Sequence, residues 1–263
     1  MDLGLSGKRA LVAAASRGLG AATARCLSLE GAQVAICARD KKRLAETADV
    51  ISKESGNPVY PLVADLSRSA QITAMVVAAA ETLGGLDILV TNAGGPPPGT
   101  FESTPLDAWA AATELTFLSA VRLVHAALPF LRQSESPAIL TISSLSVKQP
   151  IANLVLSNAV RPAVVGLTKA LAEELGPEGI RVNSILPGLT RTERVEALIE
   201  ADMARNGTTY EEEMAVRVRN TPLRRMAEPE EFARVAAFLC SPAASYVHGA
   251  MVPVDGGAIK ATL

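Results

Sequence analysis

The strongest constraint on this chain's fold is the regular alternation of strand-length apolar runs with segments whose apolar residues recur at helical spacing. The runs are apolar on both faces, which is typical of parallel strands that helices cover on both sides. They span 9–14, 33–38, 59–63, 86–91, 138–143, 181–186 and 250–254. The pattern predicts an α/β fold: a Rossmann-like, doubly wound parallel sheet of about seven strands with helices on both faces.

One long segment departs from this alternation. Residues 190–227 follow the sixth run, are rich in charge, with Glu211-Glu212-Glu213 and Arg224-Arg225, and contain no strand pattern. The segment is either a solvated insertion or a mobile helical lid over a pocket. Its place after the carboxyl end of a strand, where such sheets bind ligands, favours the lid. We expect residues 1–263 to form a single domain with this lid-like insertion.

Composition narrows the classes of function. The chain has 263 residues, and 49% of them are hydrophobic, enough for a substantial core. Its 25 Lys and Arg residues nearly balance 27 Asp and Glu residues, and aromatic residues make up only 3%. Neither the basic surface nor the base-stacking platforms of a nucleic-acid-binding protein are therefore expected.

The cysteines and the N-terminal residues indicate a cytoplasmic protein. Cys26, Cys37 and Cys240 are far apart and lie in apolar stretches, as buried thiols in a reducing compartment do. The first residues lack the basic and apolar regions of a secretory leader. No uncharged apolar run reaches the roughly 18 residues that a membrane helix needs. We expect no membrane partner and, because no metal-ligand spacing occurs, no metal site.

A glycine-containing turn follows the first predicted strand. It reads Ala14-Ala15-Ser16-Arg17-Gly18-Leu19-Gly20 and leads into a helical pattern. Glycines permit close backbone approach, so that N–H groups at a helix N-terminus can face a phosphate. The alternative is a tight turn that only needs small residues. Its position between the first strand and the first helix of an α/β sheet favours a nucleotide site.

This turn, with later motifs, resembles the short-chain dehydrogenase/reductase family, and the resemblance covers nearly the whole chain. The family's fingerprint is Thr-Gly-xxx-Gly-x-Gly. Gly18 and Gly20 match its second half, whereas Ala13 and Ala14 stand at the Thr and the first Gly. A methyl group at Ala14 need not block binding if its φ is negative, although the pyrophosphate must then sit further out or the turn must shift.

Four further motifs carry the resemblance, each at the end of a predicted strand. They are Asp65-Leu66, Asn92-Ala93-Gly94, Pro187-Gly188 with Thr192, and Asp255-Gly256-Gly257. In the family the first binds the adenine amino group, the second buttresses the sheet and lines the cofactor, and the third cradles the nicotinamide. The implied cofactor-binding residues are Ala14, Ser16, Arg17, Gly18, Leu19, Gly20, Arg39, Asp65, Leu66, Asn92, Ala93, Gly94, Pro187, Gly188 and Thr192.

The end of the second strand bears on the choice of cofactor. An acidic residue there would hold the ribose 2′-hydroxyl of NAD. This chain has Arg39 there, and Asp40 lies one position beyond. Arg39 and Arg17 could bracket a 2′-phosphate through charge-assisted hydrogen bonds, or they could be two solvated arginines. We expect NADP(H) to be favoured over NAD(H).

The catalytic positions hold altered chemistry. The family reduces a carbonyl with a Ser, a Tyr, a Lys and an Asn. Ser144 matches the Ser, but Ser157 stands at the Tyr, Arg161 at the Lys and Thr116 at the Asn. We take Ser144, Ser157 and Arg161 as the catalytic candidates. Lys148 is either a substitute acid or a solvated loop lysine.

These replacements weaken the proton donor. An aliphatic hydroxyl is a far weaker acid than a tyrosine, which titrates near pH 10. Arg161 stays cationic, so it preserves the electric field but relays no proton. Pro162 is best tolerated in the first turn of a helix, which predicts a helix start near residues 157–159 with Ser157 or Asn158 as the cap. Ser157 is then either a catalytic residue or a helix cap.

The resemblance implies a NAD(P)-dependent oxidoreductase, similar to 3-oxoacyl-carrier-protein reductases, in which hydride transfer from NADPH reduces a carbonyl with weak or altered catalysis. The substrate is a small carbonyl compound or alcohol, or an acyl thioester. A homotetramer built on helices around 111–130 and 159–176 is also implied. The alternative is a catalytically silent NADP-binding protein that acts as a sensor or as a partner subunit.

Overall fold

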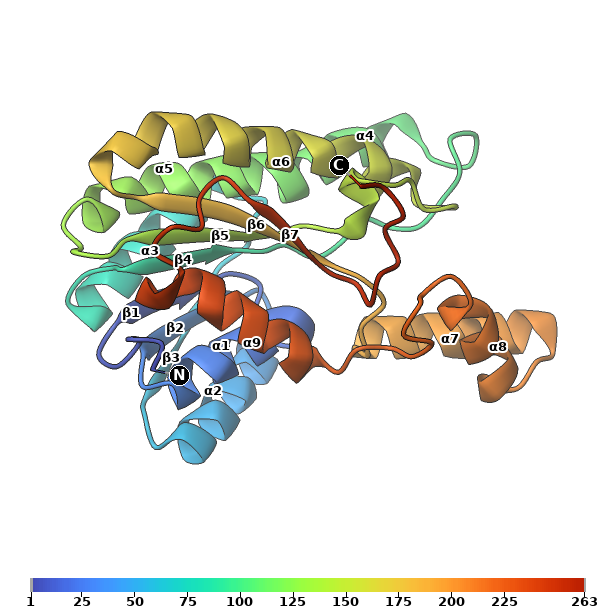
Figure 1. The fold of residues 1–263 in the computed structure, drawn as a ribbon, viewed down its shortest axis with the longest axis horizontal. Coiled ribbons are helices and arrows are strands. Elements are labelled where there is room, and N and C mark those ends of the chain that lie inside the picture. The colour runs from blue at the N-terminus through green and yellow to red at the C-terminus, as the bar shows by residue number, and fades with distance from the viewer. Residues whose placement is uncertain (1, 263) are drawn as a thin grey trace.

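Each predicted apolar run contributes a strand to one sheet in the computed structural model, which describes residues 2–262 (Figure 1). All neighbouring strands are parallel, in the order β3-β2-β1-β4-β5-β6-β7. The strands are β1 Arg9–Val12, β2 Gln33–Ala38, β3 Val59–Val63, β4 Ile88–Thr91, β5 Ala138–Ile142, β6 Arg181–Pro187 and β7 Met251–Val254. The predicted doubly wound parallel sheet is confirmed.

Helices cover both faces of the sheet (Figure 1). They are α1 Gly18–Leu29, α2 Lys41–Ser55, α3 Ser69–Leu83, α4 Leu106–Thr113, α5 Ser119–Leu131, α6 Val155–Leu175, α7 Glu193–Asn206, α8 Tyr210–Val218 and α9 Pro229–Cys240. One buried apolar cluster joins α1, α2 and α9 to one face, and a second joins α3, α5 and α6 to the other. These two layers leave the carboxyl ends of the strands free for a site.

The strand order reverses between β1 and β4, which are adjacent in the sheet but far apart in the chain. In parallel sheets such a switch point opens a crevice at the carboxyl ends of the strands. Gly20 shows how tightly α1 packs behind it, because a Cβ atom there would lie 2.6 Å from the Ala14 carbonyl oxygen and 2.9 Å from Asn92 Nδ2. Only glycine fits at this position.

Helix α6 begins earlier than the sequence predicts. It begins at Val155, so the predicted start near 157–159 and the cap at Ser157 or Asn158 are wrong. The preceding loop pairs with residues near Gly99, whose carbonyl accepts a hydrogen bond from Val155 N at 3.2 Å, and this contact sets the first turn. Pro162 lies inside the helix, on an exposed surface where its carbonyl partner can be hydrated.

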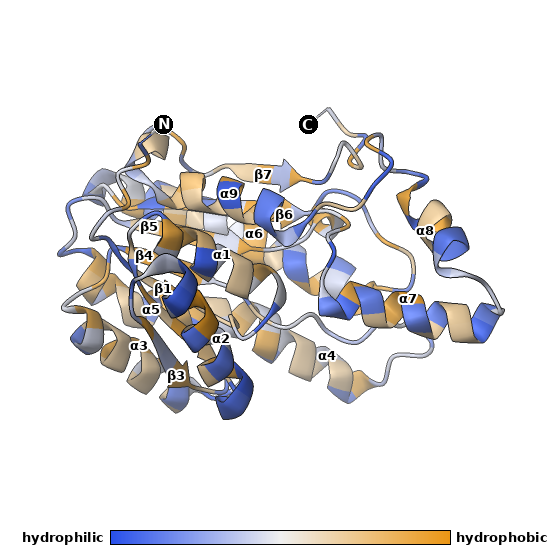
Figure 2. Cartoon of the chain, turned by 90° about the horizontal axis from the view of Figure 1, so that it is seen from below, coloured by the Kyte–Doolittle hydropathy of each residue, from blue (hydrophilic) through white to orange (hydrophobic). Residues whose placement is uncertain are grey.

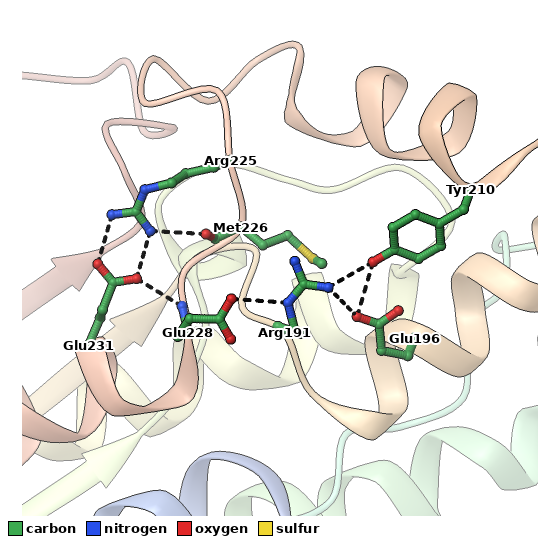
Figure 3. A network of polar contacts seen from close by, with 7 residues as sticks. All are labelled: Arg191, Glu196, Tyr210, Arg225, Met226, Glu228 and Glu231. Carbon is green, nitrogen blue, oxygen red and sulfur yellow. Dashed lines mark hydrogen bonds and ion pairs between the residues drawn. The ribbon is translucent and has the colours of Figure 1, made fainter.

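The segment 190–227 forms α7 and α8, which extend beyond the edge of the sheet as a two-helix arm (Figures 1 and 2). Its two ends meet: Arg191 N donates to the Ala227 carbonyl at 2.9 Å and Ala227 N to the Leu189 carbonyl at 3.0 Å. Arg191 also joins the arm to the body, as Figure 3 shows, by contacting Glu228, Glu196 and the Tyr210 hydroxyl. The arm is therefore a helical unit with a narrow base.

The run Leu106–Leu131 contains α4, a π-helical turn and α5, and an 18-residue window within it has a mean hydropathy of 1.3. By length and composition alone it could cross a membrane, although it contains Asp107, Glu114 and Arg122 and so is not an uncharged apolar run. A buried core helix passes the same test, and α5 packs against α3 and β4 in this fold.

Candidate functional site

A cleft of about 1210 Å³ runs along the carboxyl ends of the strands, from the start of α1 to the base of the arm. It brings together Ser144, Ser157 and Arg161 with most of the predicted cofactor-binding residues. The latter are Ala14, Ser16, Arg17, Gly18, Leu19, Arg39, Leu66, Asn92, Ala93, Gly94, Pro187, Gly188 and Thr192. Gly20 and Asp65 do not line it. Gly20 lies behind the first turn, and Asp65 Oδ1 accepts hydrogen bonds from the Ser67 backbone and hydroxyl.

The turn after β1 is strained. Ala14 has a φ of +49°, in the left-handed region, so the condition of a negative φ, under which its methyl group need not block binding, is not met. Neighbouring backbone bonds hold it there: Ala13 N donates to the Val90 carbonyl and Ala15 N to the Cys37 carbonyl. Asn92 Nδ2 adds a bond of 3.3 Å to the Ala14 carbonyl. This conformation costs about 1 kcal/mol for alanine.

The N-terminus of α1 fits a phosphate group. No side chain caps its first turn, so the N–H groups there have no side-chain partner. Gly18 has a φ of +58°, which lets the chain turn sharply into the helix. Together with the cleft beside it, this terminus provides the donors and the positive dipole end that anions favour.

A basic cluster lies at this end of the cleft. Arg43 Nη1 donates to Glu193 Oε2 at 2.7 Å and Arg17 Nη1 to the same oxygen at 3.2 Å. Burial opposes the charge on Glu193, but the hydrogen bonds from Arg43 and Arg17 prevail and lower its pKa. Arg39 also lines the cleft, and no carboxylate among residues 2–262 pairs with it. Sequence reasoning missed Arg43, although it lies one helical turn beyond Arg39.

The catalytic candidates meet at the other end. Arg161 Nε donates to Ser157 Oγ at 3.1 Å, and Arg161 Nη1 donates to the Ser143 carbonyl at 3.0 Å. Ser144 Oγ accepts a hydrogen bond from Ser146 N at 3.1 Å, which leaves its own proton free for a partner in the cleft. The Ser146 and Ser157 hydroxyl oxygens are 3.4 Å apart. Ser157 is therefore held by Arg161 and not used as a helix cap.

Two arginines at this end of the cleft, Arg161 and Arg194, have lowered pKa values. Burial is the larger cause, and repulsion from Arg194 the smaller one, of a pKa of Arg161 lowered to about 10. Arg161 therefore remains cationic at neutral pH. Burial, followed by repulsion from Arg17, also lowers the pKa of Arg194. Arg194 Nη2 donates to the Pro96 carbonyl at 2.9 Å, across the mouth of the cleft. Sequence reasoning missed Arg194, whose only signal was its place just after Thr192.

A second, small cavity of about 10 Å³ adjoins Arg161. Thr116 from the π-helical turn lines it, and the buried Thr116 Oγ1 has no hydrogen-bond partner. This volume is close to that needed for a single water molecule. A water there would satisfy the Thr116 hydroxyl and lie beside the Arg161 guanidinium.

No tyrosine within residues 2–262 lines the cleft. Tyr210 contacts Arg191 and Glu196 in the arm (Figure 3), and Tyr246 is fully exposed. Lys148, considered from the sequence as a substitute acid, also lies outside the lining. The hydroxyl groups that face the cleft near Arg161 belong to serines.

Comparison with known proteins shows extensive similarity. A family model described as enoyl-(acyl carrier protein) reductase matches residues 13–258. The short chain dehydrogenase/reductase astE of Aspergillus oryzae is 34% identical over 96% of this chain and 95% of its own. L-sorbose reductase of Gluconobacter frateurii, solved with NADPH and L-sorbose, has 33% identity and a TM-score of 0.95, covering 99% of this chain and 100% of its own.

A third similar structure is described as having an unusual catalytic site. An NADPH-bound short chain oxidoreductase from Pseudomonas aeruginosa PAO1, described as containing an atypical catalytic center, is 36% identical. Its TM-score is 0.88, and the match covers 96% of this chain and 97% of that one. The likeness therefore spans the sheet, the cleft and the arm.

Proposed function

The chain belongs to the short-chain dehydrogenase/reductase family, and we propose that it is an NADP(H)-dependent oxidoreductase that reduces a small carbonyl compound slowly. One observation carries this proposal: thirteen cofactor candidates and the three catalytic candidates line a single cleft at the switch point of the sheet. A cleft of about 1210 Å³ has room for a dinucleotide together with a small substrate. Structures of relatives with NADPH support the same cofactor class.

The basic cluster favours NADP(H) over NAD(H). Arg17, Arg39 and Arg43 line the cleft near the end of β2, where a 2′-phosphate would be neutralised by guanidinium groups. Asp40, the acidic residue nearest this place, caps α2 by accepting a hydrogen bond from Arg43 N at 3.1 Å. It is thus engaged away from a ribose hydroxyl.

The residues around Ser144 suit the polarisation of a carbonyl. The cofactor, when bound, supplies the hydride. Ser144 donates its hydroxyl proton in a hydrogen bond to the carbonyl oxygen, and the Arg161 cation stabilises negative charge that develops there. Ser157 is too weak an acid to replace a tyrosine, so solvent in the cleft is the proton source. A missing positioned acid lowers the rate by about 10²–10⁴.

A second candidate function is a silent NADP-binding sensor or partner subunit. The observation that favours it is the absence of any tyrosine from the cleft lining within the described part of the chain. A protein that binds cofactor without turnover would retain the phosphate-binding turn and the basic cluster. Such a protein would also keep the same fold.

The experiment that separates the two functions begins with binding. Quenching or enhancement of NADPH fluorescence on titration with protein measures affinity. A screen with 3-oxoacyl thioesters, diketones and small ketones then measures NADPH oxidation at 340 nm. Turnover that falls in Ser144→Ala supports the enzyme. Tight NADPH binding without oxidation by any substrate would leave the silent function.

The proposal also covers how the protein assembles, where it is located and how its arm moves. We take the enzyme to be a cytoplasmic homotetramer, resembling 3-oxoacyl-carrier-protein reductases, built on the surfaces of Leu106–Leu131 and α6. We take α7 and α8 to close over bound cofactor, because Thr192, Arg194 and Leu198 of this arm line the cleft. Light scattering on the purified protein tests the tetramer, and protection of the arm from proteolysis by NADPH tests closure.

A further inference from the structure

We propose that the substrate of this cleft carries a carboxylate, which pairs with Arg161 and Arg194. The inference rests on the proposed function and narrows its substrate class from carbonyl compounds in general to oxo acids. Reduction then follows a balanced course: the ketone carbon receives a hydride, its oxygen receives a proton, NADPH becomes NADP⁺, and the carboxylate is unchanged.

Arg161 is a cation without a counter-ion. Its two hydrogen bonds go to neutral oxygens, the Ser157 hydroxyl and the Ser143 carbonyl. Its Nη2 atom makes no hydrogen bond to any residue between 2 and 262, and no carboxylate in that range lies within 4 Å of its guanidinium. Burial of an unpaired charge is costly, and an anion brought into the cleft would relieve that cost.

Arg194 adds a second unpaired charge facing the same cleft. One of its Nη2 protons goes to the Pro96 carbonyl, and its Nε and Nη1 atoms have no partner in the described chain. Arg194 and Arg161 both line this cleft, and repulsion from Arg194 adds to burial in lowering the pKa of Arg161. Two like charges that line one cleft and have only neutral acceptors stabilise an anion placed between them.

The acidic residues that line the cleft do not supply this anion. Only Asp40 and Glu193 are acidic among its described lining residues. Asp40 accepts from Arg43 N, and Glu193 accepts from Arg43 and Arg17. Both are thus engaged at the phosphate-binding end.

A bound cofactor would not neutralise Arg161 in the same way. Arg161 lies beside Ser143 and Ser157, next to the carbonyl-polarising Ser144, whereas the donors suited to phosphates are at α1 and the basic cluster. Ribose hydroxyls near Arg161 would accept hydrogen bonds but carry no charge. A carboxylate on the substrate provides the charge beside the place where the carbonyl must lie.

The activity test compares matched pairs. NADPH oxidation is measured with 2-, 3- and 4-oxo acids and with their methyl esters, and the ratio of kcat/KM for acid to ester is taken for each pair. A substitution that slows the chemical step equally for the acid and for its ester leaves this ratio unchanged. In the natural chain we expect the acid-to-ester ratio of kcat/KM to exceed about 10 for at least one pair, which is equivalent to about 1.4 kcal/mol. Arg194→Met and Arg161→Met should bring that ratio close to one.

Arg39→Met is the matched control, because Arg39 is also a cleft arginine without a carboxylate partner but lies at the phosphate-binding end. It should raise KM for NADPH and leave the acid-to-ester ratio unchanged. A ratio near one in the natural chain, with both acids and esters reduced, would overturn the inference while leaving the proposed function intact.

A binding test does not depend on turnover. Protein saturated with NADP⁺ is titrated calorimetrically with succinate and with its neutral diamide at constant ionic strength. We expect succinate to bind at least tenfold more tightly than the diamide, and Arg161→Met or Arg194→Met to abolish the difference. If NADPH binds but no carbonyl is reduced, the proposed function fails, and the succinate titration alone decides whether the anion site exists. Equal weak binding of both probes would refute it.

Discussion

Glu193 Oε2 lies 2.7 Å from Nη1 of Arg43. A carboxylate at the start of the arm is thus paired with a guanidinium that faces the cofactor cleft. The same oxygen also accepts a hydrogen bond from Arg17. A 2′-phosphate and Glu193 would therefore compete for the same donors. Such competition would couple cofactor choice to the position of the arm.

Glu193→Gln should increase affinity for NADPH by about three- to tenfold, because it removes an anion that competes through two exposed ion pairs, each worth up to about 1 kcal/mol. Affinity for NADH should change much less. Fluorescence titration with each cofactor measures the difference. Glu196→Gln is the control, since Glu196 lies on the same helix but pairs with Arg191. An equal gain for NADH would refute the competition.

Ser144→Ala should reduce kcat by about 10²–10³, because it removes a donor to the carbonyl oxygen, with little change in NADPH affinity. Ser143→Ala makes the same chemical change one residue away. The Ser143 hydroxyl is buried and has no hydrogen-bond partner, so this variant should retain nearly full activity. Steady-state kinetics on both proteins check the assignment. Equal losses in the two variants would show that Ser144 does not polarise the substrate.

Ser157→Tyr combined with Arg161→Lys should raise turnover by at least tenfold, because a tyrosine beside a cation is a much stronger proton donor than a serine. The matched control is Ser157→Phe with Arg161→Lys, which adds the ring without its hydroxyl. Both variants are first shown to fold and to bind NADPH. If the tyrosine variant is no faster than the phenylalanine variant, Ser157 does not occupy the position of the family's proton donor.

Asp87→Asn should destabilise the protein by about 2 kcal/mol at pH 7, since it breaks hydrogen bonds that Arg9 and Ser134 donate to a buried carboxylate. Burial alone would raise the pKa of Asp87, but these bonds lower it to about 2. Stability from this group is therefore complete above its ordinary pKa near 4 and is lost as the pH falls toward 2.

Urea unfolding of this variant and of the natural chain at several pH values measures the effect. The gap between the two should narrow below about pH 4 and close near pH 2. Asp49→Asn is the control, because Asp49 pairs with Lys53 on the exposed surface of α2 and should contribute little at any pH. A gap that stays constant down to pH 2 would refute the ionic origin of the contribution.

Ala14→Gly should stabilise the protein slightly, by up to about 1 kcal/mol, because glycine adopts a positive φ without the steric cost that alanine has. It should also improve NADPH affinity by removing a methyl group from the phosphate-binding turn. Ala15→Gly, at the adjacent buried residue, should destabilise instead. Thermal unfolding with and without NADPH gives both values. A loss of stability in Ala14→Gly would contradict the strain.

The sequence was sufficient to predict the sheet because parallel strands covered on both faces need apolar runs, and each run became a strand. Residues placed at strand ends, such as Asn92 and Pro187, were also predictable to lie in one cleft, since a parallel sheet gathers its carboxyl ends at one edge. The turn at Ala14 was harder. Its φ depends on backbone partners on β2 and β4 that local sequence does not reveal.

Other features depend on tertiary contacts that no local pattern encodes. The start of α6 is set by Gly99 in a distant loop, which outweighs the preference of Pro162 for a first turn. Arg194 enters the site because the first turn of α7 lies beside the loop of Pro96. Its place just after Thr192 put it near the cofactor cleft but gave no reason to place it in the same lining as Arg161.

The two ends of the arm leave the body side by side, joined by the backbone pairing of Thr190 with Ala227. A segment attached in this way can be replaced as a unit. Its length and composition can be altered, or exchanged for the corresponding stretch of a relative, without lengthening any connection in the sheet or shifting a strand register. Changes in this segment can therefore alter one wall of the cleft while the residues on the sheet side of the cleft stay the same.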